Sequence, residues 1–199
     1  MLSKVWAFCG LIAAAAAVPA AGQSEKSTLV ASNGVSISLN ADEFADRYEY
    51  TAPDIEIPES RSVAWVGRVK VRGEWLPLQI GGLAAYQGDW RYYDQAILRG
   101  GEELTAHFTD RSVISCAGSS RRYGQGCLLS ESFMILPTRA QIERYAEDGV
   151  LAVQIRSRRG QSMTINVPLD YVAALDELTG DANQPDKYFL DDASVPDDE

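Results

Sequence analysis

The chain has 199 residues and a formal net charge of −10 at pH 7, from 28 acidic and 18 basic residues. This acidity argues against nucleic acid, and against an anionic membrane surface, as the main partner, because both attract basic proteins. The length fits one domain with a sizeable core. Fourteen of the basic residues are Arg, so a local anion site would have planar donors available that form two parallel hydrogen bonds.

The N-terminal segment has the order of a secretory signal peptide. Lys4 precedes the apolar run Val5–Val18, and the small residues around Val18-Pro19-Ala20 suit a signal peptidase. The run is too short for a bilayer core, which takes about 20 residues, and a buried N-terminal helix is the alternative. We therefore expect residues 1–22 to be removed on export, which gives a periplasmic or secreted protein. Loss of Lys4 leaves a net charge of −11, and no later stretch is apolar enough to span a membrane.

The first half of the exported chain predicts two β-hairpins. Leu29–Leu39 holds an Asn-Gly turn between alternating apolar runs, which is a strong hairpin signal. The acidic and aromatic segment Phe44–Ile57 is at best an edge strand. Val63–Val71 and Trp75–Ile80 are the second pair, in which Pro77 restricts the second run to an edge or a bulge because proline has no N–H.

Further strands are expected around two connections. Trp90–Leu98 and Leu104–Phe108 flank a Gly-Gly turn, whereas Val113–Cys116 and Cys127–Leu136 flank a polar, glycine-rich loop.

The cysteines indicate one disulfide. Cys9 lies in the expected signal peptide, so export would leave Cys116 and Cys127 as a pair in an oxidising compartment. A bond between them would close a loop of about a dozen residues and stabilise the fold by about 3 kcal/mol on the chain-entropy model.

The pattern changes after the last of these strands. Thr138–Gln141 fits a capping box, which predicts a short helix that stops at Gly149. Val150–Arg156 and Met163–Val167 alternate as a third hairpin. About Pro168–Leu178 an apolar stripe predicts a second helix, which Gly180 would end.

We therefore predict a mainly β fold over residues 23–180. The expected architecture is a single antiparallel, sandwich-like domain with two short C-terminal helices, and a two-layer α+β fold is the alternative. Residues 181–199 hold seven acidic residues and one Lys, and we expect them to form a mostly disordered acidic tail.

No motif in the sequence specifies a reaction. His107 is the only histidine, and strand alternation predicts that it points away from the core. One His and two cysteines in a disulfide make a poor zinc site, and the sequence lacks a nucleophile elbow, a phosphate loop and a calcium loop. We expect no metal and no cofactor, and we favour a non-enzymatic protein. A catalytic site assembled from residues distant in sequence stays open.

Two groups of residues are candidates for binding. Trp90 and Tyr92 belong to an aromatic-rich stretch that could stack on a sugar or hold a peptide, although aromatic residues also favour sheets and cores. Arg121, Arg122 and Tyr123 lie at the tip of the loop that the disulfide would close, and rigidity there would lower the cost of binding a partner. The alternative for this tip is a solvated turn.

The segment of about Ser115–Leu178 contains, in order, Cys116, the step Gly126-Cys127-Leu128, a helix ending in Gly over 140–149, a hairpin over 151–167 and the amphipathic run Tyr171-Val172-Ala173-Ala174-Leu175. In the order of these elements the chain resembles the periplasmic invasion-associated locus B family. The first half shows nothing that aligns with that family, and the family's additional cysteines are absent. The resemblance implies a secreted, β-rich accessory protein without catalytic residues, linked to the envelope or to host interaction.

Functionally, we expect an exported, non-enzymatic envelope accessory or binding protein that recognises another protein or an envelope polymer. A periplasmic hydrolase acting on envelope material is the alternative. A third possibility is a structural module without a ligand.

Overall fold

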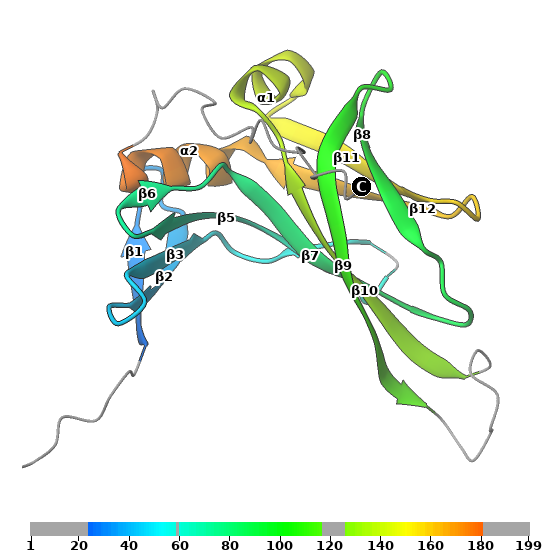
Figure 1. Ribbon diagram of the computed structural model, residues 1–199. Helices are drawn as coiled ribbons and strands as arrows, with labels where there is room; N and C mark the ends of the chain where they lie inside the picture. Colours follow the sequence, from blue (N-terminus) through cyan, green and yellow to red (C-terminus); the bar gives the residue numbers. More distant parts are fainter. Residues whose placement is uncertain (1–23, 59, 117–125, 181–199) are drawn as a thin grey trace, which may run out of the picture.

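The computed structural model describes residues 24–58, 60–116 and 126–180 (Figure 1). The expected signal peptide, the acidic C-terminal segment and the loop tip with Arg121, Arg122 and Tyr123 lie outside these residues. In the described ranges, no helix is both long and apolar enough to cross a membrane.

Antiparallel strands make up most of the described chain. One path of hydrogen-bonded neighbours runs β1-β2-β3-β5-β7-β10-β9-β8-β11-β12, with β4 and β6 paired to β5. The predicted fold class, mostly antiparallel β structure with two helices near the C-terminus, is confirmed. The strands are β1 Glu25–Val30, β2 Ser36–Asp42, β3 Arg47–Thr51, β4 Ile55–Glu56, β5 Val63–Val71, β6 Glu74–Trp75, β7 Gln79–Gln87, β8 Tyr93–Leu98, β9 Glu103–Cys116, β10 Cys127–Leu136, β11 Val150–Ser157 and β12 Ser162–Pro168.

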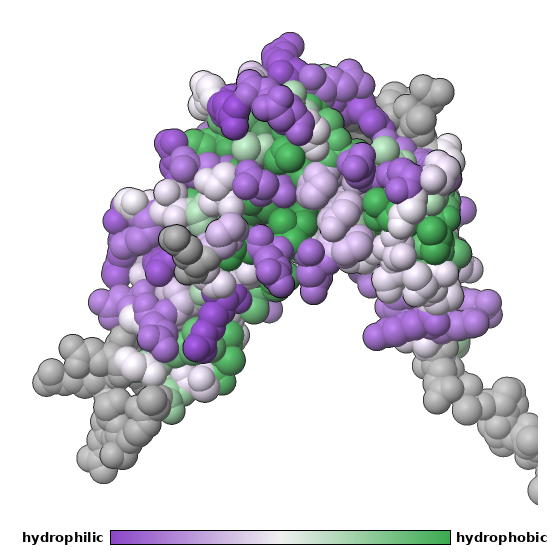
Figure 2. Space-filling model, turned by 180° about the vertical axis from the view of Figure 1, so that it is seen from behind, coloured by the Kyte–Doolittle hydropathy of each residue, from purple (hydrophilic) through white to green (hydrophobic). Residues whose placement is uncertain are grey.

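The path changes direction at β9. Its first residues, Glu103 and Leu104, pair with β8, whereas Thr105 to Cys116 pair with β10. As a result β8, β11 and β12 cross over the sheet that β5, β7 and β10 continue (Figure 1). The whole molecule forms an arch with a hollowed underside between two legs (Figure 2).

One hydrophobic core joins the two parts of the path and the second helix. Its fully buried side chains alternate along the strands, as expected for sheets with one face covered. They include Val66 of β5, Ile80 of β7, Ile135 of β10, Leu151, Val153 and Ile155 of β11, Ile165 and Val167 of β12, and Leu175 of α2.

Both helices begin and end with the residues that the sequence indicated, with one difference. In α1, Arg139–Tyr145, the capping box between Thr138 and Gln141 is present in both directions. In α2, Leu169–Thr179, Gly180 ends the helix in the left-handed conformation (φ 71°). The predicted stop of α1 at Gly149 is wrong, because the helix ends at Tyr145 and Gly149 serves a turn before β11.

The hairpins of residues 29–39 and 150–167 are confirmed, but three expectations about strands need correction. The segment 44–57 was expected at best at an edge, yet β3 lies inside the sheet between β2 and β5. Strand β8 begins at Tyr93, so Trp90 and Tyr92 belong to the preceding loop. The two strands predicted over 104–116 are one strand, β9, whose ladder to β10 contains two register shifts. Pro77 lies between β6 and β7, where no strand pairing requires the N–H that proline lacks.

Candidate functional site

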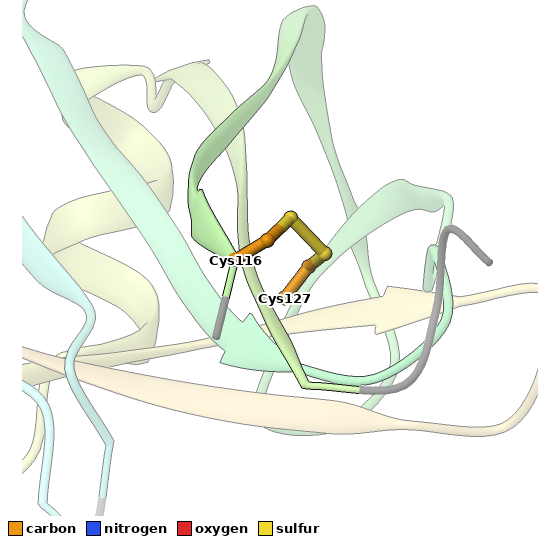
Figure 3. Close-up of a disulfide and its surroundings, with 2 residues drawn as sticks. All are labelled: Cys116 and Cys127. Carbon is orange, nitrogen blue, oxygen red and sulfur yellow. A yellow bond between two sulfur atoms is a disulfide. The ribbon is translucent and has the colours of Figure 1, made fainter. Parts of the chain in front are cut away.

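The disulfide joins the two long strands of the leg on one side of the arch. Cys116 ends β9 and Cys127 begins β10, and they are directly opposite each other in the ladder, with their Cα atoms 4.0 Å apart (Figure 3). The bond therefore closes the outer end of the β9–β10 pair. Cys127 is buried, whereas Cys116 is exposed.

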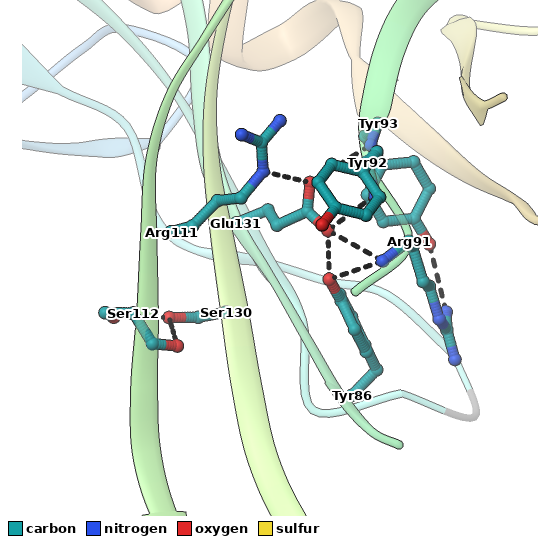
Figure 4. Close-up of polar contacts among 8 residues, drawn as sticks. All are labelled: Tyr86, Arg91, Tyr92, Tyr93, Arg111, Ser112, Ser130 and Glu131. Carbon is teal, nitrogen blue, oxygen red and sulfur yellow. Dashed lines mark hydrogen bonds and ion pairs between the residues drawn. The ribbon is translucent and has the colours of Figure 1, made fainter. Parts of the chain in front are cut away.

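A buried carboxylate lies halfway along the same pair of strands. Glu131 of β10 is only 2% exposed and faces the loop between β7 and β8. Its Oε1 accepts the backbone N–H groups of Arg91 (3.1 Å) and Tyr92 (2.9 Å), and its Oε2 accepts that of Tyr93 (3.0 Å). Three consecutive N–H groups thus converge on one carboxylate (Figure 4), an arrangement that suits an anion.

Two side chains complete the shell around Glu131. The Tyr86 hydroxyl donates to Oε1, and the Arg111 Nε donates to Oε2 at 3.4 Å. Burying a carboxylate is costly unless it is paired and hydrogen-bonded. Five donors meet this requirement and occupy both oxygens, so Glu131 acts as an anchor for the loop and has no oxygen left to serve as a general base.

The Tyr86 hydroxyl stays protonated in this environment. Burial raises the pKa of Tyr86 most, the hydrogen bond from the N–H of Arg91 partly offsets this, and the hydrogen bond and charge of Glu131 raise it again. A protonated phenol is a donor, which is what the carboxylate requires. The ring of Tyr86 also carries the Arg91 guanidinium, 4.3 Å above its centre.

Tyr92, whose N–H bonds to Glu131, has its side chain turned toward solvent. Its backbone is left-handed (φ 59°), a conformation that costs a residue with a Cβ about 1 kcal/mol. The hydrogen bond from its N–H to Glu131 offsets that cost, and the ring is turned outward, 39% exposed. Trp90, two residues earlier, is partly buried against the core instead.

Two guanidinium groups from other elements lie against the Tyr92 ring. Arg111 of β9 is 4.8 Å from the ring centre, and Arg159, in the turn between β11 and β12, is 5.3 Å from it. Cation–π contacts at exposed sites contribute about 0.5–1 kcal/mol each. Next to Arg159, the exposed Arg158 is paired with Asp94 of β8. We call Tyr92, Arg111, Arg158 and Arg159 the Tyr92 surface.

The structure places the binding candidates from the sequence in different environments. Tyr92 lies on an exposed basic surface, Trp90 packs inward, and the tip residues Arg121, Arg122 and Tyr123 fall outside the described residues. His107 is exposed on β9, as alternation predicted. Within the described ranges, no group of three or more His, Cys, Asp or Glu side chains could hold a metal ion.

Sequence reasoning missed Glu131, Arg111 and Arg159. One signal could have found the first of them: Glu131 is the single charged residue in the strand Cys127–Leu136, which is otherwise apolar or small and polar. A lone carboxylate in such a strand needs a partner, because charged side chains are almost never fully buried unless paired. The Arg residues carry no comparable signal, since their neighbours come from distant segments.

Comparison with known proteins does not extend the site. The chain matches no protein-family model, no curated protein and no solved structure.

Proposed function

We propose that this protein is an exported, non-enzymatic binding protein of the cell envelope, and that the Tyr92 surface recognises an anionic group on another envelope protein or polymer. The observation that carries the proposal is the position of the Tyr92 ring. A buried carboxylate fixes it outward between two guanidinium groups that come from different elements.

The composition of the surface suits recognition. Tyr and Arg are the residue types that dominate binding energy in protein interfaces. A guanidinium pairs with a carboxylate or phosphate through two parallel hydrogen bonds. Because Glu131 and the strand pairing hold the backbone of Tyr92 and Arg111 in advance, a ligand would order few groups on binding.

An anionic ligand can reach the Arg side chains of the Tyr92 surface. The side chain of Arg158 is 82% exposed although Asp94 contacts it, and that of Arg111 is 45% exposed. Exposed ion pairs contribute about 0–1 kcal/mol, so a ligand anion can replace Asp94 at Arg158 at small cost. Arg111 keeps its Nε on the buried Glu131 and offers the rest of its guanidinium group. Within the described part of the chain, Arg159 contacts the Tyr92 ring and has no carboxylate partner.

Two further arguments support an extracytoplasmic protein. A disulfide between Cys116 and Cys127 is of the kind that persists in oxidising compartments. The resemblance to the invasion-associated locus B family implies the same location and the absence of catalytic residues.

The hydrolase alternative gains no support at the Tyr92 surface, because the one buried carboxylate there is saturated with donors.

The test compares anionic and neutral probes on two matched variants. The probes are polygalacturonate, polyaspartate and neutral dextran, bound to the chain from residue 23 at 50 and 300 mM NaCl. Arg159→Gln removes one charge from the Tyr92 surface, and Arg47→Gln removes one from an exposed pair with Glu49 on β3. We expect an anionic probe to bind the wild type and to bind Arg159→Gln at least fivefold more weakly, with Arg47→Gln unchanged within twofold.

Equal weakening by both substitutions would show that only the overall charge matters, and would contradict a defined surface. Binding of dextran as strong as that of the anionic probes, or no binding of either anionic probe, would contradict an anionic ligand.

A further inference from the structure

The segment that follows α2 in the sequence is rich in acidic residues. Residues 181–199 hold seven acidic residues and one Lys. We propose that this segment occupies the Tyr92 surface of its own chain, so that an external anionic ligand must displace it. This inference rests on the proposed function of the same surface.

Charge complementarity supports this occupant. The acids of the segment are grouped, with Asp191-Asp192 and Asp197-Asp198-Glu199 as two short runs. Arg111 and Arg159 place two guanidinium groups from different elements against the Tyr92 ring, and Arg158, next to Arg159 in sequence, adds a third that is paired with Asp94. Attraction between such groups is strong only within about 8 Å at physiological ionic strength, so the segment must lie on the surface to gain from it.

The chain length allows the contact. The turn that carries Arg159 leads into β12, of seven residues, which leads directly into α2, of eleven. At about 3.3 Å per strand residue and about 1.5 Å per helix residue, this path measures about 40 Å. Gly180 therefore lies within that distance of the start of β12.

Nineteen further residues span about 65 Å when extended. Even if Gly180 lies at the greatest separation, the run Asp197-Asp198-Glu199 reaches the Tyr92 surface. At shorter separations Asp191-Asp192 reaches it as well.

Tethering makes a weak contact sufficient. A segment joined to its site by a linker of this length has an effective concentration of the order of 1 mM. An acidic peptide that binds the free surface with a dissociation constant of about 1 mM would therefore occupy it about half of the time in cis. An external polymer with many acids could still displace it, because it gains from several contacts at once.

The experiment neutralises the segment in the full chain. The test variant combines Asp191→Asn, Asp192→Asn, Asp197→Asn, Asp198→Asn and Glu199→Gln. A control variant removes the same charge from five exposed acids that have no side-chain contact in the described structure: Glu25→Gln, Glu43→Gln, Asp54→Asn, Glu56→Gln and Asp148→Asn. Both variants change the net charge equally, so a general electrostatic effect cancels.

Two measurements are made at 50 mM NaCl. The first is the affinity for fluorescent polyaspartate, which we expect to rise about twofold in the test variant over the control variant, because a surface that is occupied half of the time in cis shows half of its free affinity. The second is the NMR signal of the Arg111 and Arg159 Nε–H groups. We expect these signals to differ between wild type and test variant, to be the same in wild type and control variant, and to converge in all three at 300 mM NaCl.

Equal polyaspartate affinity in the test and control variants, together with unchanged Arg signals, would overturn the inference while leaving the proposed function intact. Failure of all three proteins to bind either polyaspartate or polygalacturonate would remove both. Arg signals that change with protein concentration between 20 and 500 μM would overturn the contact in cis and indicate the segment of a second copy.

Discussion

The carboxylate of Glu131 accepts the backbone N–H of Tyr92 at 2.9 Å, so a buried acid on one strand sets the position of an exposed ring on a loop. The two residues are 39 positions apart in sequence. Tyr92 also has a left-handed backbone, an outward ring and two guanidinium groups against that ring. Substitution of Glu131 should therefore affect both the stability of the fold and the geometry of the Tyr92 surface.

Glu131→Gln is expected to destabilise the protein by about 3 kcal/mol. A carboxamide has one acceptor oxygen where the carboxylate has two. Its NH2 group would face N–H donors that now bond to a carboxylate oxygen, so these buried donors would be left unpaired. Urea unfolding at pH 7 measures the loss. Glu103→Gln, an exposed acid on β9, is the control and is expected to change stability by less than about 0.5 kcal/mol. A Glu131→Gln protein as stable as the control would show that the anchor is not needed.

Tyr86 predicts how stability depends on alkaline pH. Burial and Glu131 raise the pKa of Tyr86 above its ordinary value of 10.0. A group with a raised folded-state pKa keeps its full contribution below the unfolded pKa and loses it as pH rises toward the folded pKa. The free energy of unfolding should therefore fall as pH rises above 10.

Tyr86→Phe separates this effect from general alkaline denaturation. We expect the variant to lose about 1–2 kcal/mol at pH 7, because Glu131 loses one donor. Between pH 9 and 11 its free energy of unfolding should fall less steeply than that of the wild type. Parallel curves for the two proteins would contradict a raised Tyr86 pKa.

The indole of Trp65 depends on a glycine in the neighbouring strand. Trp65 of β5 is directly opposite Gly81 of β7, and a Cβ at position 81 would come within 2.1 Å of the ring. Gly81→Ala is therefore expected to cost about 2 kcal/mol through overpacking. In a double-mutant cycle with Trp65→Ala, the cost of Gly81→Ala should be much smaller when the indole is absent. Additive effects of the two substitutions would show that they do not contact each other.

The disulfide predicts a redox dependence of stability. Replacing Cys116 and Cys127 together by Ala is expected to lower the free energy of unfolding by about 3 kcal/mol, because the unfolded chain gains the freedom of the opened loop. Dithiothreitol should have the same effect on the wild type and none on the double variant. Two free thiols in the untreated chain from residue 23, detected by mass spectrometry, would contradict the bond.

Local signals in the sequence were reliable guides to local structure. The capping box at Thr138, the helix end at Gly180 and the hairpin of residues 150–167 all follow from contacts within a few residues. The alternation that places Leu104 inward and His107 outward is equally local, since successive side chains of a strand point to opposite faces. Such features depend on residues that are neighbours in the chain, so they can be predicted from a single sequence.

The order of the strands across the sheet was harder to predict from the sequence. The acidic and aromatic composition of β3 suggests an edge, but its neighbours β2 and β5 are supplied by the chain on either side of it, and they enclose it. Tyr92 is of a residue type that favours strands, yet it lies in the loop before β8, where its N–H and that of Arg91 bond to Glu131. In both cases a contact from elsewhere in the chain overrides the local preference.

The sequence by itself determined the antiparallel β class, the helix ends and the pairing partner open to Cys116, because these follow from periodicity, capping chemistry and a count of cysteines. Only the tertiary structure decided that Tyr92, Arg111 and Arg159 share one surface. The physical reason is that these side chains come from a loop, a strand and a turn that are joined by long-range strand pairing and by one buried carboxylate. Neither of these interactions leaves a pattern in the neighbouring sequence beyond the lone charge of Glu131 in its strand.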